Sequence, residues 1–325
     1  MDVRFGILGA RRIAHKFAEA LSGVGGVPAA VASRDKERAE AFGERHGIPV
    51  SYGSYAELLA DPQIDCVYVA TPHGLHRDHM IACLEAGKPV LCEKAFTLDL
   101  PEAEEVFRLA ASRGLFVMEA MWTRFLPVIR EALLAVQNGE IGKVVSLEAD
   151  FAFPGDRDPA GRLLDPALGG GALLDVGIYP ITLANLFLGI PESFRAEARF
   201  AVTGVDVDET IVYGYPDAEA VLRASFLKLR SRTARIKGTE GSLVLPAFWA
   251  AERAEIRDVS GRLRRRIVHP HLVNGMEYEI LETARCLKEG RKESPLMPWS
   301  ETREILRQTD GIRGLWNFRY PRENR

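Results

Sequence analysis

The chain has 325 residues, which is long enough for two domains that each bury a core of their own. Hydrophobic residues make up 47% of it and charged residues 27%, as in ordinary globular proteins, and the formal net charge of −3 argues against nucleic acid or an anionic membrane as a partner. We find no apolar run approaching bilayer length, no signal-peptide pattern after Met1 and no framework spacing among the four cysteines, so we expect reduced thiols and a cytoplasmic protein.

Short apolar runs alternate with helix-length stretches in the first third of the chain. The runs cover residues 3–10, 28–33, 65–72, 89–95 and 115–122. Residues 76–87 and 100–114 carry apolar side chains at helical spacing, and both stretches end on glycine. This alternation predicts right-handed crossovers and a parallel, doubly wound sheet, an α/β fold. We predict that residues 1–122 form this domain, a Rossmann domain for a dinucleotide.

After a predicted helix at 124–139 the hydrophobic period changes. Residues 142–153 alternate apolar with polar side chains, and 194–204, 209–216 and 220–230 follow in the same style. They predict an α+β domain over residues 123–325 with a large, mostly antiparallel open sheet. Helices are predicted at 170–189, 275–289 and 298–316. The basic run at 261–268 is interpreted as a solvated strand and not as a nucleic-acid site.

The segment GILGARRIA, residues 6–14, is a near match to the dinucleotide fingerprint G-x-G-x-x-G/A. Gly9 and Ala14 fit, but Arg11 replaces the glycine that lets the backbone approach a pyrophosphate. The predicted strand before Gly9 and helix from Ala14 supply the context, because a helix N-terminus offers free N–H groups to phosphate. The alternative is a plain turn with Gly9 in a left-handed conformation. The residues expected to contact the dinucleotide here are Gly9, Ala10, Arg11, Arg12 and Ile13.

The end of the second predicted strand indicates which nucleotide binds. An NAD site carries Asp or Glu there for the ribose 2′-hydroxyl, whereas this chain has Ser33 and Arg34, with Arg38 one turn later. Guanidinium groups match phosphate geometry, so these residues predict NADP in preference to NAD. Arg11 then adds charge near the phosphates. The alternative is that Asp35 caps a helix and the arginines are solvated.

Two longer segments resemble a known family. Residues 92–127, CEKAFTLDLPEAEEVFRLAASRGLFVMEAMWTRFLP, and 169–180, GGGALLDVGIYP, are similar to signature segments of the glucose–fructose oxidoreductase/inositol dehydrogenase (Gfo/Idh/MocA) family. They are most similar to its branch of dimeric dihydrodiol dehydrogenases and NADP-dependent D-xylose dehydrogenases. The resemblance implies hydride transfer between nicotinamide and a secondary alcohol or carbonyl of a sugar or trans-dihydrodiol. It also implies a homodimer.

The family's E-K-P motif stands here as Glu93, Lys94 and Ala95. The resemblance implies that Lys94 is catalytic and, with Glu93, lies at the cofactor. A lysine at the end of a central parallel strand lies in the crevice where such sheets bind ligands, and its charge stabilises an alkoxide or phenolate. The family's proline is commonly preceded by a cis peptide. Alanine leaves cis and trans both open, because cis costs about 3 kcal/mol here.

Asp175 and Tyr179 are four residues apart, so a helix places them on one face. The resemblance implies that Tyr179 is the general acid and base and that Asp175 hydrogen-bonds the substrate hydroxyl. An ammonium at Lys94 within about 4–6 Å would lower the pKa of the tyrosine. Without the resemblance, a tyrosine buried by packing is an equal alternative.

Three histidines, His73, His76 and His79, invite a metal by their spacing. They straddle a predicted helix start and lack an acidic or cysteine cluster, so we expect no metal. The resemblance places Thr71, Pro72 and His76 at the nicotinamide end instead.

Trp122 and Phe151 match aromatic positions of the dihydrodiol branch, and an aromatic wall suits a sugar ring or cyclic diol. Interdomain core is the alternative interpretation of both residues. For the whole chain, two other functions stay open. One is a 1,5-anhydrofructose reductase-like sugar reductase, and the other is a non-catalytic NADP-binding sensor.

Overall fold

The computed structural model describes residues 2–324 and forms two compact units. The units are Met1–Trp122 with His271–Glu304, and Thr123–Pro270 with Ile305–Arg325. Residues 271–304, predicted in the second domain, group with the first unit, because helix α8 (Glu277–Lys288) packs on helix α1 (Arg12–Gly23). Helix α9 (Trp299–Leu315) begins in the first unit and ends in the second.

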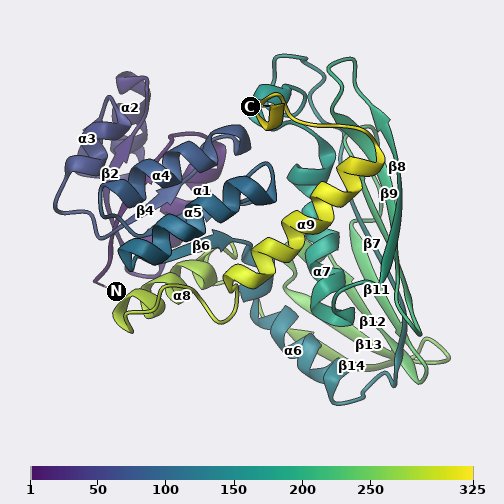
Figure 1. Cartoon of the computed structure of the whole chain (residues 1–325). Coiled ribbons are helices and arrows are strands. Elements are labelled where there is room, and N and C mark those ends of the chain that lie inside the picture. Colours follow the sequence, from purple (N-terminus) through teal and green to yellow (C-terminus); the bar gives the residue numbers. More distant parts are fainter. Residues whose placement is uncertain (1, 325) are drawn as a thin grey trace. The chain divides into compact units, whose positions relative to one another are not determined.

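Within the described chain, the first unit holds a parallel six-stranded sheet in the order β3-β2-β1-β4-β5-β6. Figure 1 labels β2, β4 and β6 of this sheet. The predicted doubly wound sheet is confirmed. Its strands are β1 (Arg4–Leu8), β2 (Val27–Ala32), β3 (Val50–Tyr52), β4 (Cys66–Val69), β5 (Val90–Glu93) and β6 (Val117–Ala120). Its other helices are α2 (Lys36–His46), α3 (Tyr55–Ala60), α4 (His76–Glu85) and α5 (Leu100–Arg113).

The burial and the order of the strands together locate the expected ligand crevice of this sheet. Every residue of β4, β5 and β6 is buried, as a strand covered by helices on both faces requires. The chain goes outward from β1 to β2 and β3, then returns to β4 on the other side of β1. Ligands of open parallel sheets bind beyond the carboxyl ends of the strands at this reversal. The turns after β1, β4 and β5 therefore face the expected site.

The second unit is built on an eight-stranded sheet in the order β14-β13-β12-β11-β7-β10-β9-β8. Every strand pair is antiparallel except β7 with β10, so the predicted mostly antiparallel sheet is confirmed. The strands are β7 (Val144–Ala152), β8 (Ser193–Phe200), β9 (Asp206–Gly214), β10 (Glu219–Ser225), β11 (Thr233–Gly238), β12 (Gly241–Pro246), β13 (Arg253–Asp258) and β14 (Leu263–Val268).

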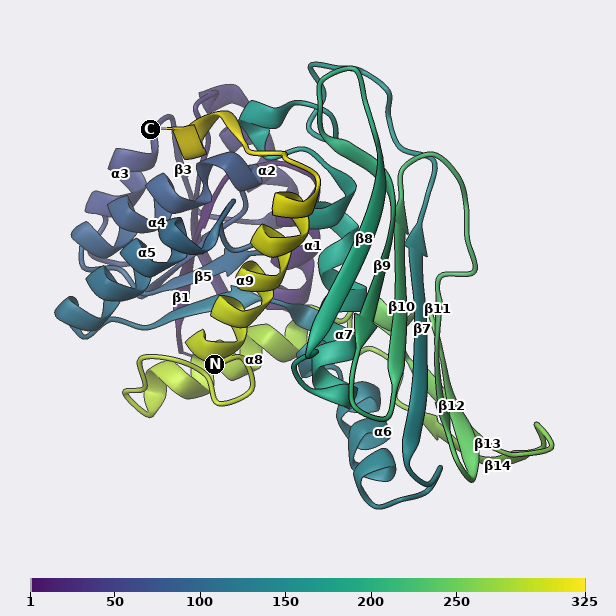
Figure 2. The ribbon, with the colours of Figure 1, turned by 45° about the vertical axis from the view of Figure 1, so that its right-hand side comes forward.

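Helices cover one face of this sheet. Helix α6 (Pro127–Gln137) packs on β13 and β14, and α7 (Ile178–Leu188) packs on β7 and β10. The second half of α9 joins them, where Gln308 accepts a hydrogen bond from the Tyr213 hydroxyl at 2.8 Å. Figure 2 shows no helix of the described chain on the opposite face. That face carries polar side chains, as the alternation of the strands predicts.

The predicted helix at 170–189 is interrupted. Residues Leu173–Gly177 form a π-helical turn, and α7 continues from Ile178. By length and composition, the helical run Pro166–Leu188 could cross a membrane, with a mean hydropathy of 1.5. This finding corrects the expectation that no apolar run approaches bilayer length. Of its most apolar window, 83% is buried inside the protein. Burial of this extent is typical of a core helix.

Candidate active site

The turn after β1 has the geometry of a phosphate-binding turn. Gly9 has a φ of +106°, and a Cβ there would lie 3.0 Å from the Ala70 carbonyl oxygen, so only glycine fits. Arg11 takes the N-cap position of α1 in an extended conformation, and no side chain caps the helix. Its first-turn N–H groups and positive dipole therefore suit a phosphate. Ala10 is buried and Ile13 is partly buried, whereas Arg11 and Arg12 are exposed.

Three arginines gather around one phenol at the end of β2 and the start of α3. Burial raises the pKa of Tyr55, and the guanidinium groups of Arg34, Arg11 and Arg38 oppose the rise. Arg11, from the glycine turn, thus shares a neighbourhood with the two arginines predicted to bind the 2′-phosphate. All three side chains are exposed, so a phosphate can reach this cationic cluster.

Ser33 and Asp35 shape the same strand end. Ser33 is 5% exposed, and its Oγ accepts a hydrogen bond from the Asp35 backbone N–H at 3.2 Å. The Asp35 carboxylate caps α2 by accepting from the Arg38 N–H at 3.1 Å, and it pairs with the Arg38 guanidinium at 3.0 Å. Asp35 is therefore a cap, as the alternative interpretation of this segment held. Arg38 keeps one ion pair while its side chain stays 47% exposed.

The loop after β5 holds Lys94 at the carboxyl edge of the sheet. Lys94 is partly buried, and the peptide between Lys94 and Ala95 is cis, the alternative left open by the sequence. Glu93 is buried and accepts a hydrogen bond from the Tyr68 hydroxyl. The loop is fixed further by Glu119, whose carboxylate accepts from the Phe96 N–H at 3.1 Å. No pattern in the sequence points to Glu119, because this contact joins the ends of two neighbouring strands.

His76 binds two loops together. It is fully buried, with Nδ1 at 2.8 Å from the Ala95 carbonyl oxygen and Nε2 at 2.7 Å from that of Thr71. Burial lowers its pKa, which favours the neutral ring. A neutral ring carries one N–H and so donates to one of these two carbonyl oxygens, while both nitrogens lie against the backbone of the loops that hold Lys94 and Pro72. His76 is placed to position these loops.

The other two histidines make contacts of their own. The His79 Nδ1 lies 2.9 Å from the Thr71 hydroxyl, and its ring meets Tyr55 edge-on. The His73 ring contacts the His76 ring with a centroid separation of 5.7 Å. Within residues 2–324, no group of three or more His, Cys, Asp or Glu side chains is arranged to hold a metal ion.

In the second unit, the π-helical turn presents Asp175. The carboxylate forms a two-pronged ion pair with Arg162, with N–O distances of 3.0 and 3.3 Å. Arg162 comes from the loop after β7 and was not predicted, since no local pattern links residues 13 apart. The Arg162 side chain is 48% exposed and that of Asp175 is 11% exposed. Any substrate hydroxyl that binds Asp175 would therefore meet the guanidinium as well.

Tyr179 belongs to an aromatic cluster. It is 6% exposed, and its ring lies 5.3 Å from that of Phe151. Phe151 stacks on Trp249 at 4.0 Å, so Trp249 adds an aromatic surface that the sequence analysis did not identify. Arg232 lies over the Trp249 ring at 5.6 Å.

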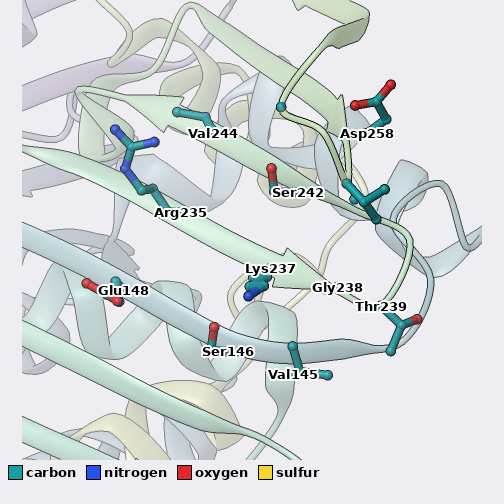
Figure 3. Close-up of a pocket in the computed structure, with 13 residues that line it drawn as sticks. Val145, Ser146, Glu148, Arg235, Lys237, Gly238, Thr239, Ser242, Val244 and Asp258 are labelled. Atoms are coloured by element: carbon teal, nitrogen blue, oxygen red, sulfur yellow. The ribbon is translucent and has the colours of Figure 1, made fainter.

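The predicted residues divide between the two units. Trp122, Lys94 and the nucleotide-binding residues belong to the first unit, whereas Phe151, Asp175 and Tyr179 belong to the second. A hollow of about 600 Å³ lies on the helix-free face of the second unit's sheet, between β7, β11 and β12 (Figure 3). Ser146, Glu148, Arg235 and Lys237 line it, and it contains none of the predicted site residues. Lys94 lies instead after β5, and Asp175 and Tyr179 lie in and just after the π-helical turn.

Two family models match the chain, one in each of these units. Residues 3–121 match the family model described as "Oxidoreductase family, NAD-binding Rossmann fold", and residues 129–244 match the "GFO/IDH/MocA C-terminal domain". A trans-1,2-dihydrobenzene-1,2-diol dehydrogenase of Xenopus laevis is 35% identical over 335 residues, covering 99% of this chain and 100% of the relative. The enzyme of the same name in Homo sapiens is 34% identical, covering 91% and 90%.

Two solved structures of oxidoreductases are similar to this chain over nearly its whole length. A 3-ketoreductase from Actinomadura kijaniata in complex with NADP and TDP-benzene has a TM-score of 0.85 and 28% identity, covering 97% of this chain and 98% of that one. An aldose–aldose oxidoreductase from Caulobacter crescentus, complexed with glycerol, also has a TM-score of 0.85, with 25% identity and coverage of 100% and 99%.

Proposed function

Because the chain belongs to the Gfo/Idh/MocA family of NAD(P)-binding oxidoreductases, we propose that it is an NADP-dependent enzyme acting on a secondary alcohol or carbonyl of a sugar or trans-dihydrodiol. The observation that carries the proposal is the end of β5. There Lys94 follows a fully buried strand, and His76 and Glu119 fix its loop at the carboxyl edge of the parallel sheet. A lysine held this firmly beside a dinucleotide turn suits catalysis.

The proposed roles follow from the chemistry of each side chain. The bound nicotinamide supplies or accepts the hydride. Gly9 and the start of α1 hold the phosphates, and Lys94 stabilises negative charge on the substrate oxygen. Tyr179 exchanges the proton with that oxygen. Asp175, held by Arg162, hydrogen-bonds a substrate hydroxyl.

The aromatic surface of the second unit favours a cyclic substrate. Phe151 and Trp249 are stacked and offer a flat apolar face, while Arg162 and Asp175 offer paired polar groups. A ring with one apolar face and neighbouring hydroxyls matches this combination. Sugars and trans-dihydrodiols share these features. Trp122, in the first unit, is proposed as a further part of the aromatic wall.

An absorbance assay tests the function directly. Purified protein with NADP⁺ is incubated with trans-1,2-dihydrobenzene-1,2-diol or D-xylose, and with NADPH and 1,5-anhydrofructose, while the nicotinamide band is followed. Turnover of the diol or of the sugar identifies the substrate class, and turnover of 1,5-anhydrofructose alone supports the reductase alternative. Tight NADP binding without turnover of any compound would support the sensor alternative and contradict the enzyme.

We expect cofactor preference to depend on the cationic cluster of Arg11, Arg34 and Arg38. Charge-assisted contacts with phosphate contribute about 1.5–3 kcal/mol each, so NADP⁺ should bind at least about tenfold more tightly than NAD⁺. Arg38→Ala should weaken NADP⁺ binding by about tenfold and leave NAD⁺ nearly unchanged, as measured by fluorescence titration. The control is Lys36→Ala on the same helix, whose ammonium lies 3.8 Å from Glu40. Equal affinity of the wild type for both cofactors would rule out the preference.

We also propose a cytoplasmic homodimer in which the helix-free sheet faces of two copies meet. The face is polar, and its predicted contact residues are Glu148, Asp150, Glu197, Arg199 and Arg223. Arg223 already pairs with Asp150 at 3.3 Å and with Glu148 at 3.5 Å. The hollow in Figure 3 lies on the same face and would be enclosed by a second copy. Such an interface would be polar and contain water.

Light scattering checks the assembly. The wild type should have twice the 36.0 kDa mass of one chain. Arg223→Glu should shift the mass toward one chain, because it places a third carboxylate beside Glu148 and Asp150. Lys16→Glu, an exposed residue of α1, should leave the mass unchanged. A wild-type mass of one chain at every concentration would contradict the dimer.

A further inference from the structure

We propose that Asp206 and Glu209 share one proton behind the π-helical turn and act as positioning residues for Asp175 and Tyr179. Both lie in β9, next to the turn, and both are buried, with exposed fractions of 0% and 2%. The proposed reaction does not use either carboxyl group directly. The inference about catalysis rests on the proposed function, whereas the shared proton does not.

The two carboxyl groups can attract each other only if they share a proton. The carboxyl groups of Asp206 and Glu209 lie within hydrogen-bonding reach of each other. Yet Asp206 Oδ1 and both carboxyl oxygens of Glu209 find no donor among the described residues. Two ionised carboxylates would offer acceptors alone and would repel each other at low dielectric. One proton turns this repulsion into a hydrogen bond.

The proton belongs on Glu209. Burial and the neighbouring Asp206 raise the pKa of Glu209 well above its usual range. Asp206 is the better carboxylate, because its Oδ2 accepts a hydrogen bond from the Leu173 N–H at 2.7 Å. Burial raises the pKa of Asp206 as well, and hydrogen bonds oppose the rise. Glu209 is therefore the donor and Asp206 the acceptor.

The other carboxylates near the pair, Asp208 and Asp175, each have a partner of opposite charge. The strand partners of Glu209 are Ala198 in β8 and Ala224 in β10, which are uncharged. On its own strand, Asp208 adds to the rise in the pKa of Glu209 and lies 3.1 Å from Lys228. On the π-helical turn, Asp175 pairs with Arg162. On the C-terminal side, the Tyr320 hydroxyl donates to the Gly170 carbonyl oxygen at 2.7 Å.

Glycines let the pair touch the backbone of the turn. A Cβ on Gly177 would lie 2.2 Å from Glu209 Oε1, and one on Gly171 would lie 2.6 Å from Asp206 Oδ1. Gly171 also has a φ of +123°, which a side chain rarely tolerates. The carboxyl pair therefore lies directly against both ends of the segment that carries Asp175. Asp206 holds its start through Leu173, and Glu209 packs at its end, two residues before Tyr179.

The turn needs such support because it is irregular. A π-helical turn is less stable than an α-helix and persists where neighbours hold it. The Leu173 hydrogen bond and the packing at Gly177 supply that constraint. Loss of the proton donor would leave Asp206 Oδ1 without a donor in the core, and the turn would shift or admit water.

Infrared difference spectroscopy tests the proton itself. The spectrum of the wild type minus that of Glu209→Gln at pH 7 should contain the carbonyl band of a protonated carboxylic acid. The amide of Gln keeps a donor for Asp206 but has no such band. A difference spectrum without the band would overturn the shared proton, whether or not the protein is an enzyme.

Three variants test the positioning role. Glu209→Leu removes the donor and Glu209→Gln keeps it. Asp208→Asn is the control, because it makes the same carboxyl-to-amide change on the neighbouring residue of the strand. Hydrogen exchange of the amides at 173–179 should accelerate at least tenfold in the Leu variant and stay unchanged in the other two. With NADP⁺ and trans-1,2-dihydrobenzene-1,2-diol, kcat should fall at least tenfold in the Leu variant alone, with the Kd for NADP⁺ unchanged.

Two results would overturn the positioning role. One is unchanged amide exchange in Glu209→Leu, and the other is equal losses of kcat in the Gln and Leu variants. If Glu209→Leu does not fold, the Gln variant decides, because a tenfold loss of kcat despite a retained donor contradicts the inference. If the wild type turns over no compound of the panel, the proposed function fails, while the exchange and infrared experiments still decide the inference.

Discussion

Lys94→Met is expected to lower kcat by about 10³-fold or more, while NADP⁺ binding changes by much less. Removing one electrostatic contact to a developing oxyanion costs about 10²–10³-fold. In the proposed mechanism Lys94 also favours the phenolate of Tyr179, so its loss removes a second effect. Met keeps the length and apolar stem of the side chain and removes only the ammonium. Steady-state kinetics with trans-1,2-dihydrobenzene-1,2-diol and a titration with NADP⁺ measure the two quantities.

Lys88→Met is the matched control for this prediction. Lys88 lies before the other end of β5, and its ammonium donates to the carbonyl oxygens of Asp61 at 2.7 Å and Ile64 at 2.9 Å. Its loss should reduce stability and leave kcat unchanged. A Lys94→Met enzyme with kcat within tenfold of the wild type would show that the charge at this strand end is not used in catalysis.

The architecture of the first unit could be predicted from the apolar runs in the sequence. Strands such as Val90–Glu93 are buried at every position, so they are read as unbroken apolar runs. The short strands β11, β12 and β13 were not identified. The outward positions of β11 carry the charges of Arg235 and Lys237, and each of the three strands has only six residues over which apolar and polar side chains can alternate. The chain's return to the first unit over 271–304 was missed for another reason, since helix periodicity does not reveal which partner a helix packs on.

The residues of the candidate site divide in the same way into those that the sequence indicates and those that it does not. Gly9, Lys94 and the pair Asp175 and Tyr179 lie in local motifs, and local motifs are visible in one sequence. Arg162, Trp249 and Glu209 reach the site through contacts distant along the chain. For His76, the sequence predicted a place at the nicotinamide end, which stays a prediction, and only the structure shows both ring nitrogens within 2.8 Å of backbone carbonyl oxygens.

Tyr179→Phe is expected to lower kcat by about 10²–10⁴-fold, the range for loss of a positioned acid–base group. The aromatic ring is kept, so the contact with Phe151 at 5.3 Å should survive and the second unit should fold normally. Tyr213→Phe is the matched control, because that buried hydroxyl donates to Gln308 on α9 and takes no part in the proposed reaction. Its loss should lower stability by about 1 kcal/mol and leave kcat intact.

The pH dependence separates an acid–base role of Tyr179 from a packing role. Oxidation of an alcohol needs the phenolate as base, so its rate should rise with pH as the tyrosine ionises. Reduction of a carbonyl needs the neutral phenol as acid, so its rate should fall over the same range. Tyr179→Phe should abolish both trends. Because Lys94 acts partly through Tyr179, the double variant should lose less than the product of the two single losses. Independent, multiplying losses, or a Phe variant with the wild-type pH profile, would assign the proton transfer to another group.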